Sequence, residues 1–177
     1  IGLVTARSNK STQIDHFFVS TLPIETKCGE HTTQSVLFPL WLYPIDEASS
    51  AHKGQGRRAP NLNSEFIASV LNAIGLEPTD WRGGEPTAEL TAEKVFFYIY
   101  SILHSNAYRE LFAGSLRIDF PHVPMPGSKS LFNDLVVIGE QLVSWQTLES
   151  ATAKAIKATE HPSVSGVPVF FGRDRQL

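Results

Sequence analysis

Three residues near the start of the chain have the types that a metal-dependent nuclease uses. Asp15 is followed by Glu25 and Lys27, which gives an Asp…Glu-x-Lys pattern. In such an arrangement two carboxylates hold Mg²⁺, and the lysine stabilises the attacked phosphate. A pattern this loose recurs in unrelated sequences, and carboxylates at strand ends are commonly solvated or paired. A nuclease built on these three residues is therefore kept as an alternative interpretation.

Other catalytic patterns are missing from the sequence. It contains no GxxxxGK[ST] phosphate loop, no NPPY-type methyltransferase motif and no glycine-rich loop after a strand. Cys28 and His31 have the spacing of metal ligands, but no second pair accompanies them. We therefore expect no catalytic centre, no metal site and no cofactor in this chain.

A polar turn between the first two predicted strands carries side chains suited to DNA. Arginine can pair with guanine edges, asparagine and glutamine with adenine, and small donors or cations with phosphate. The same composition also fits an ordinary polar hairpin followed by a half-buried histidine. The candidate DNA-contacting residues of this stretch are Arg7, Ser8, Asn9, Lys10, Gln13 and His16.

Basic residues are relatively frequent in the first third of the chain. The whole chain has a net charge of −3. Residues 1–60 hold six basic and five acidic residues, whereas residues 61–177 hold nine and thirteen. Residues 46–60 are polar and show no periodicity, which predicts a mobile loop. This loop contains Lys53, Arg57 and Arg58. They are either solvated charges or a basic arm that contacts DNA phosphates.

The pattern of apolar residues predicts an α/β or α+β fold. Strand-like stretches (IGLVT, IDHFFVS, SVLFPLWLY) fill the first 45 residues, and helical periodicity follows from residue 61. We expect one domain over residues 1–177, with a β-rich, DNA-facing part (1–60) and a helical scaffold (61–177). Expected helix caps are Asn63 or Ser64, Thr91, Ser105, and Ser128 or Ser130 at N-termini, and Gly75 and Gly114 at C-termini.

The last predicted helix runs from Ser128 or Ser130 to about residue 157. Its apolar residues recur four and three positions apart, which is the spacing of a single buried face. These residues are Leu131, Leu135, Ile138, Leu142 and Trp145.

A proline-rich strap precedes this helix in the stretch SLRIDFPHVPMPGSKSLF. Pro121, Pro124 and Pro126 fix their own φ angles and favour extended geometry in the preceding residues. The strap should be a stiff ribbon whose backbone groups are free to meet other segments.

Several of these stretches resemble one known family. FFYIYSILHSNAYRELFAGSLRIDFPHVPMP is similar to a block in the C-terminal specificity region of type ISP restriction–modification enzymes, with the pattern YxYAxLHSPxYRxxY…LKxDFPRIP. LFNDLVVIGEQLVSWQTLE, FPLWLYP and APNLNSEF also resemble blocks of that family, in the same order. The resemblance covers about residues 1–150. His122 stands where the family usually carries arginine.

The resemblance implies a DNA target-recognition domain of a large fused enzyme. Such enzymes combine a nuclease, an ATP-driven motor and an adenine-N6 DNA methyltransferase. The parent would use S-adenosylmethionine, Mg²⁺ and ATP, and the partners of this chain would be double-stranded DNA and the methyltransferase and motor domains of the same polypeptide. A purely structural docking module remains a further alternative. The sequence begins at Ile1 without an initiator methionine, so we expect a piece of a longer chain.

The expected cellular setting is the cytoplasm. Cys28 is the only cysteine, so no disulfide framework is available. No apolar run approaches the ~18–20 residues of a membrane span, so we expect no membrane partner.

The nuclease alternative makes a direct prediction. We expect the chain to show no Mg²⁺-dependent cleavage of supercoiled plasmid, because Asp15, Glu25 and Lys27 lack supporting motifs. Nicking by the wild-type chain that disappears in Glu25→Ala would establish the nuclease instead.

Overall fold

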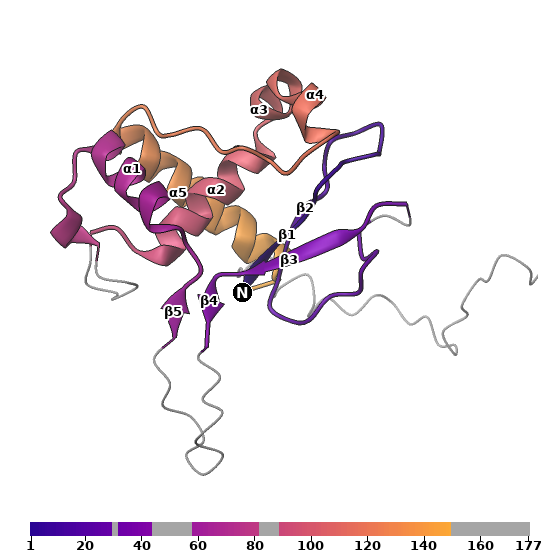
Figure 1. Cartoon of the computed structure of the whole chain (residues 1–177), viewed down its shortest axis with the longest axis horizontal. Coiled ribbons are helices and arrows are strands. Elements are labelled where there is room, and N and C mark those ends of the chain that lie inside the picture. Colours follow the sequence, from indigo (N-terminus) through magenta and orange to yellow (C-terminus); the bar gives the residue numbers. More distant parts are fainter. Residues whose placement is uncertain (30–31, 44–57, 82–88, 150–177) are drawn as a thin grey trace, which may run out of the picture.

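The first sixty residues contribute two small antiparallel sheets. The computed structural model describes residues 1–29, 32–43, 58–81 and 89–149. β1 (Gly2–Ala6) lies between β2 (Phe17–Ser20) and β3 (Ser35–Pro39) and runs antiparallel to both (Figure 1). β4 (Trp41–Leu42) pairs with β5 (Ala59–Pro60). Helices follow from residue 64, so the predicted α+β fold with strands first is confirmed.

The end of the predicted mobile loop is a strand. Within residues 46–60, only Arg58, Ala59 and Pro60 belong to the described part of the chain. Ala59 pairs with Leu42 and Pro60 with Trp41. Proline is tolerated here because a two-stranded sheet has only edge strands. A pairing this short has no periodicity, so the sequence pattern could not indicate it.

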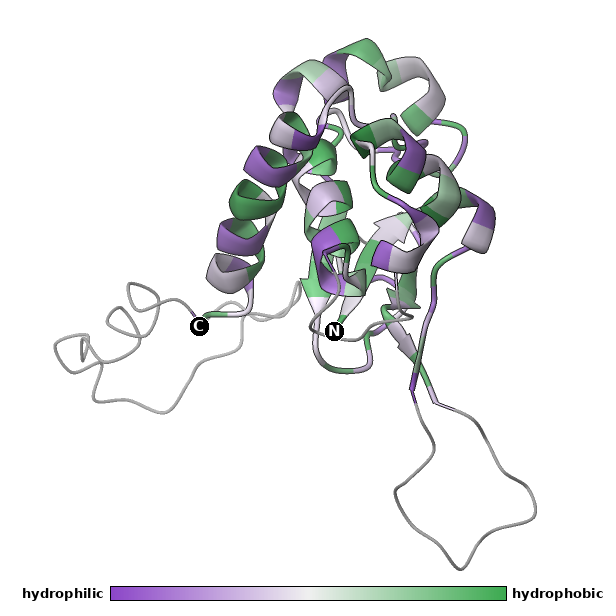
Figure 2. Cartoon of the chain, turned by 90° about the vertical axis from the view of Figure 1, so that its left-hand side faces the viewer, coloured by the Kyte–Doolittle hydropathy of each residue, from purple (hydrophilic) through white to green (hydrophobic). Residues whose placement is uncertain are grey.

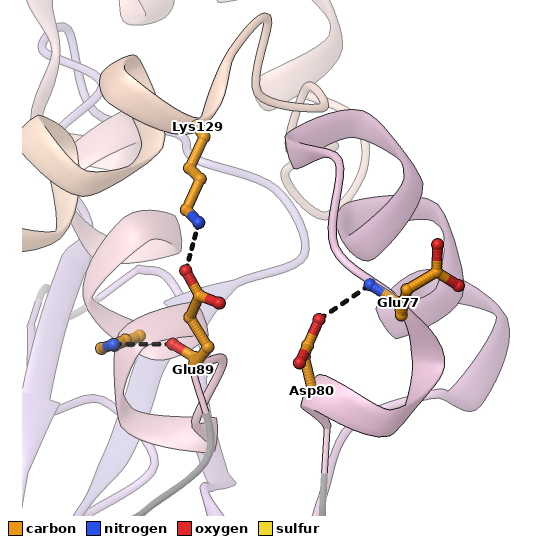
Figure 3. Close-up of polar contacts among 5 residues, drawn as sticks. Glu77, Asp80, Glu89 and Lys129 are labelled. Atoms are coloured by element: carbon orange, nitrogen blue, oxygen red, sulfur yellow. Dashed lines mark hydrogen bonds and ion pairs between the residues drawn. The ribbon is translucent and has the colours of Figure 1, made fainter.

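Helix α1 (Ser64–Ile74) begins and ends as its sequence predicts. The Asn63 side chain accepts hydrogen bonds from the N–H groups of Glu65 and Phe66, and Gly75 ends the helix with φ 70°. A short 3₁₀ turn, η1 (Pro78–Asp80), follows. The Glu77 N–H donates to Asp80 Oδ2 at 2.8 Å and fixes this turn (Figure 3).

The centre of the molecule is the contact between α2 (Ala92–His104) and α5 (Lys129–Gln146). Thr91 and Ser128 cap the two helices, as predicted. Gly139 lets the backbones approach closely, because a Cβ atom there would lie 1.9 Å from the carbonyl oxygen of Phe97. Around this contact, α1 contributes four buried residues to a shared core: Ile67, Val70, Leu71 and Ile74.

The first turns of α2 and α5 are also joined through Glu89. Its carboxylate pairs with Lys129, and its carbonyl accepts a hydrogen bond from Lys94 Nζ at 2.6 Å (Figure 3). Both contacts are solvent-exposed, so they add little to stability by themselves. They orient the residues that lead into α2.

The predicted buried face of α5 is only partly right: Leu135 and Leu142 are half-buried against the core, but the centre of the buried face lies one residue further along. The buried positions are Phe132, Val136, Gly139 and Val143. Leu131, Ile138 and Trp145 are 47%, 48% and 56% exposed. Both sets follow a four-three spacing, so periodicity could not choose between them. In Figure 2 hydrophobic and hydrophilic residues alternate along the helices, so hydropathy alone does not single out the buried face.

The end of α5 also differs from the prediction. The helix ends at Gln146 rather than near residue 157, and residues 150–157 lie outside the described part. Leu148 adopts φ 59°. Its N–H donates to Trp145 O, and the Glu149 N–H donates to Ser144 O, at 3.2 and 2.8 Å. This is a Schellman motif formed without glycine, which explains why no stop signal was visible.

Two short helices lie between α2 and the strap. α3 (Asn106–Leu111) is capped by Ser105, as predicted. Gly114 does not end it, because the chain continues into α4 (Ala113–Leu116) and Gly114 lies inside that turn. Within the described residues, no helix is long and apolar enough to cross a membrane.

The strap crosses from α4 to α5 without helix or strand between Phe120 and Gly127 (Figure 1). Tyr98 Oη donates to the carbonyl of Pro124 at 2.8 Å, and Tyr108 Oη donates to the carbonyl of His122 at 3.0 Å. Burial raises the pKa of Tyr98 to about 12, so this hydroxyl keeps its proton and acts as a donor. The expectation that strap backbone groups meet other segments is confirmed.

The glycine contact between α2 and α5 can be tested with a matched pair of substitutions. Gly139→Ala should destabilise the fold by about 1–3 kcal/mol or more, because the new methyl group would overlap the Phe97 carbonyl. Gly114→Ala is the control, since a Cβ there meets no atom within 4 Å. It should be neutral or stabilising by up to about 1 kcal/mol. Urea denaturation measures both; equal midpoints for the two variants would contradict the close contact.

A second pair of variants tests the phase of α5. Phe132 is 1% exposed, so Phe132→Ala should cost about 3–5 kcal/mol through the cavity it leaves. Ile138 is 48% exposed, so Ile138→Ala should cost less than about 1 kcal/mol. Chemical denaturation compares the two. The reverse order of effects would restore the face that the sequence predicted.

Candidate nucleic-acid interface

The β1–β2 loop (residues 7–16) is organised around the buried side chain of Asn9. Asn9 is only 4% exposed. Its amide oxygen faces the N–H groups of Asp15 and His16 at 3.3 and 3.1 Å, and its amide nitrogen faces Ser11 Oγ at 3.2 Å. Asn9 therefore holds the two ends of the loop together, and its side chain does not lie at the surface.

The other polar residues of the loop are more accessible. Arg7, Lys10, Thr12 and Gln13 are exposed, and Ser8 is half-buried. Arg7 Nε lies 3.5 Å from Asp119 Oδ1 on the strap, and the two side chains remain 74% and 52% exposed. An ion pair this exposed is weak, so Arg7 can exchange Asp119 for another partner at little cost.

His16 connects the loop to the outer face of the sheet. It is 4% exposed. Its Nε2 lies 2.8 Å from Ser35 Oγ, and its ring meets the Phe18 ring edge-on at 5.2 Å. A Cβ atom at Gly29 would lie 2.3 Å from His16 Cε1, so glycine is needed where that segment crosses. The structure thus places His16, like Asn9, among the residues that support the loop.

The helical part holds the loop from its other side. The Arg117 Nη1 and Nη2 groups donate to the carbonyls of Ser11 and Thr12 at 3.0 and 3.3 Å. The Asn9 N–H donates to the carbonyl of Leu116 at 3.0 Å. Figure 1 shows the loop beside α4 and the start of the strap. The contact of Arg117 with the loop was not predicted from the sequence, because no local spacing connects residues 106 positions apart.

A second arginine, Arg109 of α3, lies half-buried beneath the loop. Its Nε donates to the carbonyl of Leu103 at 2.7 Å, and its guanidinium lies over the Phe17 ring at 5.5 Å. Nη2 lies 3.3 Å from His104 Nδ1. Burial, together with the nearby Arg109 charge, lowers the pKa of His104 to about 4. His104 is therefore neutral at physiological pH, and its Nδ1 accepts from Arg109.

The tip of the loop stands between two hollows. One, of about 380 Å³, lies between the loop and α3–α4 and is bordered by Asn106, Arg109, Glu110 and Arg117. The other, of about 280 Å³, lies on the sheet side and is bordered by His16, Phe18 and Gly29. Thr12, Gln13 and Asp15 line both hollows. The exposed tip is therefore a ridge that carries donors and acceptors.

Of the predicted basic arm only Arg58 belongs to the described residues, and it is not next to this ridge. Lys53 and Arg57 lie outside the described residues. Arg58 is exposed and stacks on Trp41, with its guanidinium carbon 4.0 Å from the ring centroid. Trp41 lies two residues after Pro39, which pairs with Gly2 at the start of β1. The β1–β2 loop begins after Ala6, at the other end of β1. Arg58 and the ridge thus lie at opposite ends of β1, a strand roughly 16 Å long.

The residues of the nuclease alternative have other contacts in the structure. Glu25 Oε2 accepts a hydrogen bond from the backbone N–H of Lys27 at 2.8 Å, and Asp15 Oδ1 lies 3.4 Å from Ser11 Oγ. Within residues 1–29, 32–43, 58–81 and 89–149, no group of three or more His, Cys, Asp or Glu residues is placed to hold a metal ion. Cys28 is exposed, and His31 lies outside the described residues.

The ridge thus presents exposed donors and acceptors on a helical scaffold. The sequence matches the family model described as the type ISP C-terminal specificity domain over residues 1–168. The chain therefore belongs to that family, and the resemblance noted from the sequence is confirmed. Membership assigns it to DNA target recognition in a restriction–modification enzyme. Neither the curated proteins nor the solved structures include a significant match.

Proposed function

We propose that this chain reads the DNA target of its parent enzyme with the ridge of the β1–β2 loop and performs no catalysis itself. The single observation that carries the proposal is the ridge, which presents exposed donors between two hollows. A ridge of this kind can enter a DNA groove, and the hollows on its two sides leave space for the sugar–phosphate backbones that border the groove. Family membership supplies the ligand class.

The proposed reading residues are Arg7, Lys10 and Gln13, because their side chains are exposed on the loop that forms the ridge. Arginine can make two hydrogen bonds to a guanine edge, glutamine can do the same to adenine, and lysine suits guanine or phosphate. Ser8 is half-buried and is proposed as a phosphate contact. Asn9 and His16 were expected to touch DNA; their burial favours a supporting role instead.

The proposed phosphate contact at the far end of β1 is Arg58. Its stacking on Trp41 holds the guanidinium plane and leaves the in-plane N–H edges to meet an anion. Lys53 and Arg57 precede it in the sequence and are proposed to act with it. Contacts at both ends of β1 would fix the direction in which the ridge lies on the duplex.

The parent polypeptide is proposed to supply the remaining contacts and all of the chemistry. A chain of net charge −3 gains little from general attraction to a polyanion. We therefore assign most of the binding energy to the adjoining methyltransferase and motor domains. S-adenosylmethionine, Mg²⁺ and ATP would be used by those domains, in modification of adenine N6, in DNA cleavage and in movement along DNA. The parent would act in the cytoplasm.

Base reading and phosphate binding can be separated by substitution in the parent enzyme. Arg7→Ala should cost about 1–3 kcal/mol on the cognate duplex only, because a base contact is lost. Arg58→Ala should weaken binding to every duplex alike and reduce the salt slope by about one unit. Titrations of cognate and scrambled duplexes at two salt concentrations measure both effects.

Lys129→Gln is the control for these titrations. It removes one cation from the start of α5, where Lys129 pairs with Glu89 far from the ridge. It should change neither affinity nor discrimination. If Arg7→Ala keeps the full preference for the cognate duplex, Arg7 is not a reading residue. If Arg7→Ala, Lys10→Ala and Gln13→Ala all keep it, the ridge does not read bases.

A further inference from the structure

We propose that Arg117 is the positioning residue of the reading ridge, so that the helical part of the chain determines which bases the ridge accepts. Arg117 lies just after α4, and the ridge belongs to the loop after β1. The inference deepens the proposed function and rests on it for its consequence in DNA recognition. The clamp itself is a property of the free protein and can be tested without DNA.

The geometry of Arg117 suits a clamp. Its two terminal nitrogens donate to two successive carbonyls, those of Ser11 and Thr12, at 3.0 and 3.3 Å. A planar guanidinium can satisfy two neighbouring carbonyls at once, and hydrogen bonds from a charged donor are stronger than neutral ones. The fork therefore fixes the direction of the peptide groups at the ridge, next to Gln13.

The clamp is anchored in the core through the preceding residue. Leu116 is 3% exposed and packs with Phe17, Leu103 and Tyr108. Its carbonyl accepts the N–H of Asn9 at 3.0 Å. One short segment, Leu116–Arg117, thus holds the middle of the loop to the helices, while the Asn9 side chain closes the loop from within. The ridge has a fixed place before any DNA arrives.

The same segment also contacts the first reading residue. Asp119, two residues after Arg117, pairs with Arg7 at 3.5 Å. Arg7 enters the loop from β1, and Ser11 and Thr12 form its tip, so the α4 end contacts both the base and the tip of the ridge.

A competing role for Arg117 is direct contact with phosphate. The two roles differ in whether lysine can substitute for Arg117. Lysine keeps the positive charge but cannot present a planar fork to two carbonyls. A phosphate contact therefore survives in Arg117→Lys, whereas a clamp is lost in both Arg117→Lys and Arg117→Ala. Lys129→Gln again controls for the loss of a cation elsewhere.

The first experiment measures amide hydrogen exchange of the free chain. The informative amides are those of Asn9, Asp15 and His16, because their N–H groups are hydrogen-bonded only while the loop is closed. Arg117→Lys and Arg117→Ala should each speed their exchange by roughly tenfold. Exchange of Val4, in the central strand, should stay unchanged and show that the fold is intact. Unchanged loop amides in both variants would overturn the clamp.

The second experiment selects duplexes with a randomised central segment on the parent enzyme and sequences the bound pool. Both Arg117 variants should broaden the selected sequence and keep the wild-type salt slope. The variants could instead show faster amide exchange in the loop and still select the same narrow set of duplexes as the wild type. That result would support the clamp and refute base reading by the ridge. In a third outcome, Arg117→Lys behaves as the wild type and Arg117→Ala loses affinity for all duplexes. This result would identify a phosphate contact and overturn the proposal.

Discussion

The approach of α5 to α2 at Gly139 is the constraint on which the rest of the fold depends. A glycine at this position brings the α5 backbone against the Phe97 carbonyl, a distance that no side chain would allow. The two helices together then form the wall against which α1 and the sheet pack. Gln146, at the end of α5, accepts hydrogen bonds from Tyr100 Oη and from the backbone N–H of Val19. One amide oxygen thus joins both central helices to β2.

Support passes from this helix pair to the loop in a short series of contacts. The end of α2 places Leu103 and His104 around Arg109, and α4 adds Leu116 to the same cluster as Phe17. The strap adds an aromatic contact, because Phe120 meets Phe38 of β3 edge-on at 5.5 Å. The sheet is therefore held along one edge by the strap and at the loop end by α4. The loop is therefore held in place by contacts with the helices.

The local features of the fold could be predicted from the sequence, whereas its long-range features could not. Asn63, Thr91 and Ser128 cap helices because each acts on its own first turn. The burial of α5 depends instead on where α2 lies. Two apolar stripes one residue apart competed, and the stripe with Gly139 is the buried one because close backbone approach outweighed the larger side chains of Leu131 and Ile138.

The candidate site also has features that the sequence predicts and features that it does not. Arg7, Lys10 and Gln13 were identified by residue type in a turn, and they are exposed. Asn9 has equally suitable chemistry but is buried, because its amide completes the hydrogen bonds of the loop. Residue type alone cannot distinguish a side chain that reads a ligand from one that shapes the loop. The contact of Arg117 with the loop carried no signal, since its partners lie in a distant part of the chain.

The attachment of the strap has a consequence for how freely its sequence can change during evolution. Tyr98 and Tyr108 bind the carbonyl groups of Pro124 and His122, so the anchor uses atoms that every residue possesses. The exposed side chains at these two positions can be exchanged while both hydrogen bonds remain. The strap can thus keep its course while its outer surface is remodelled.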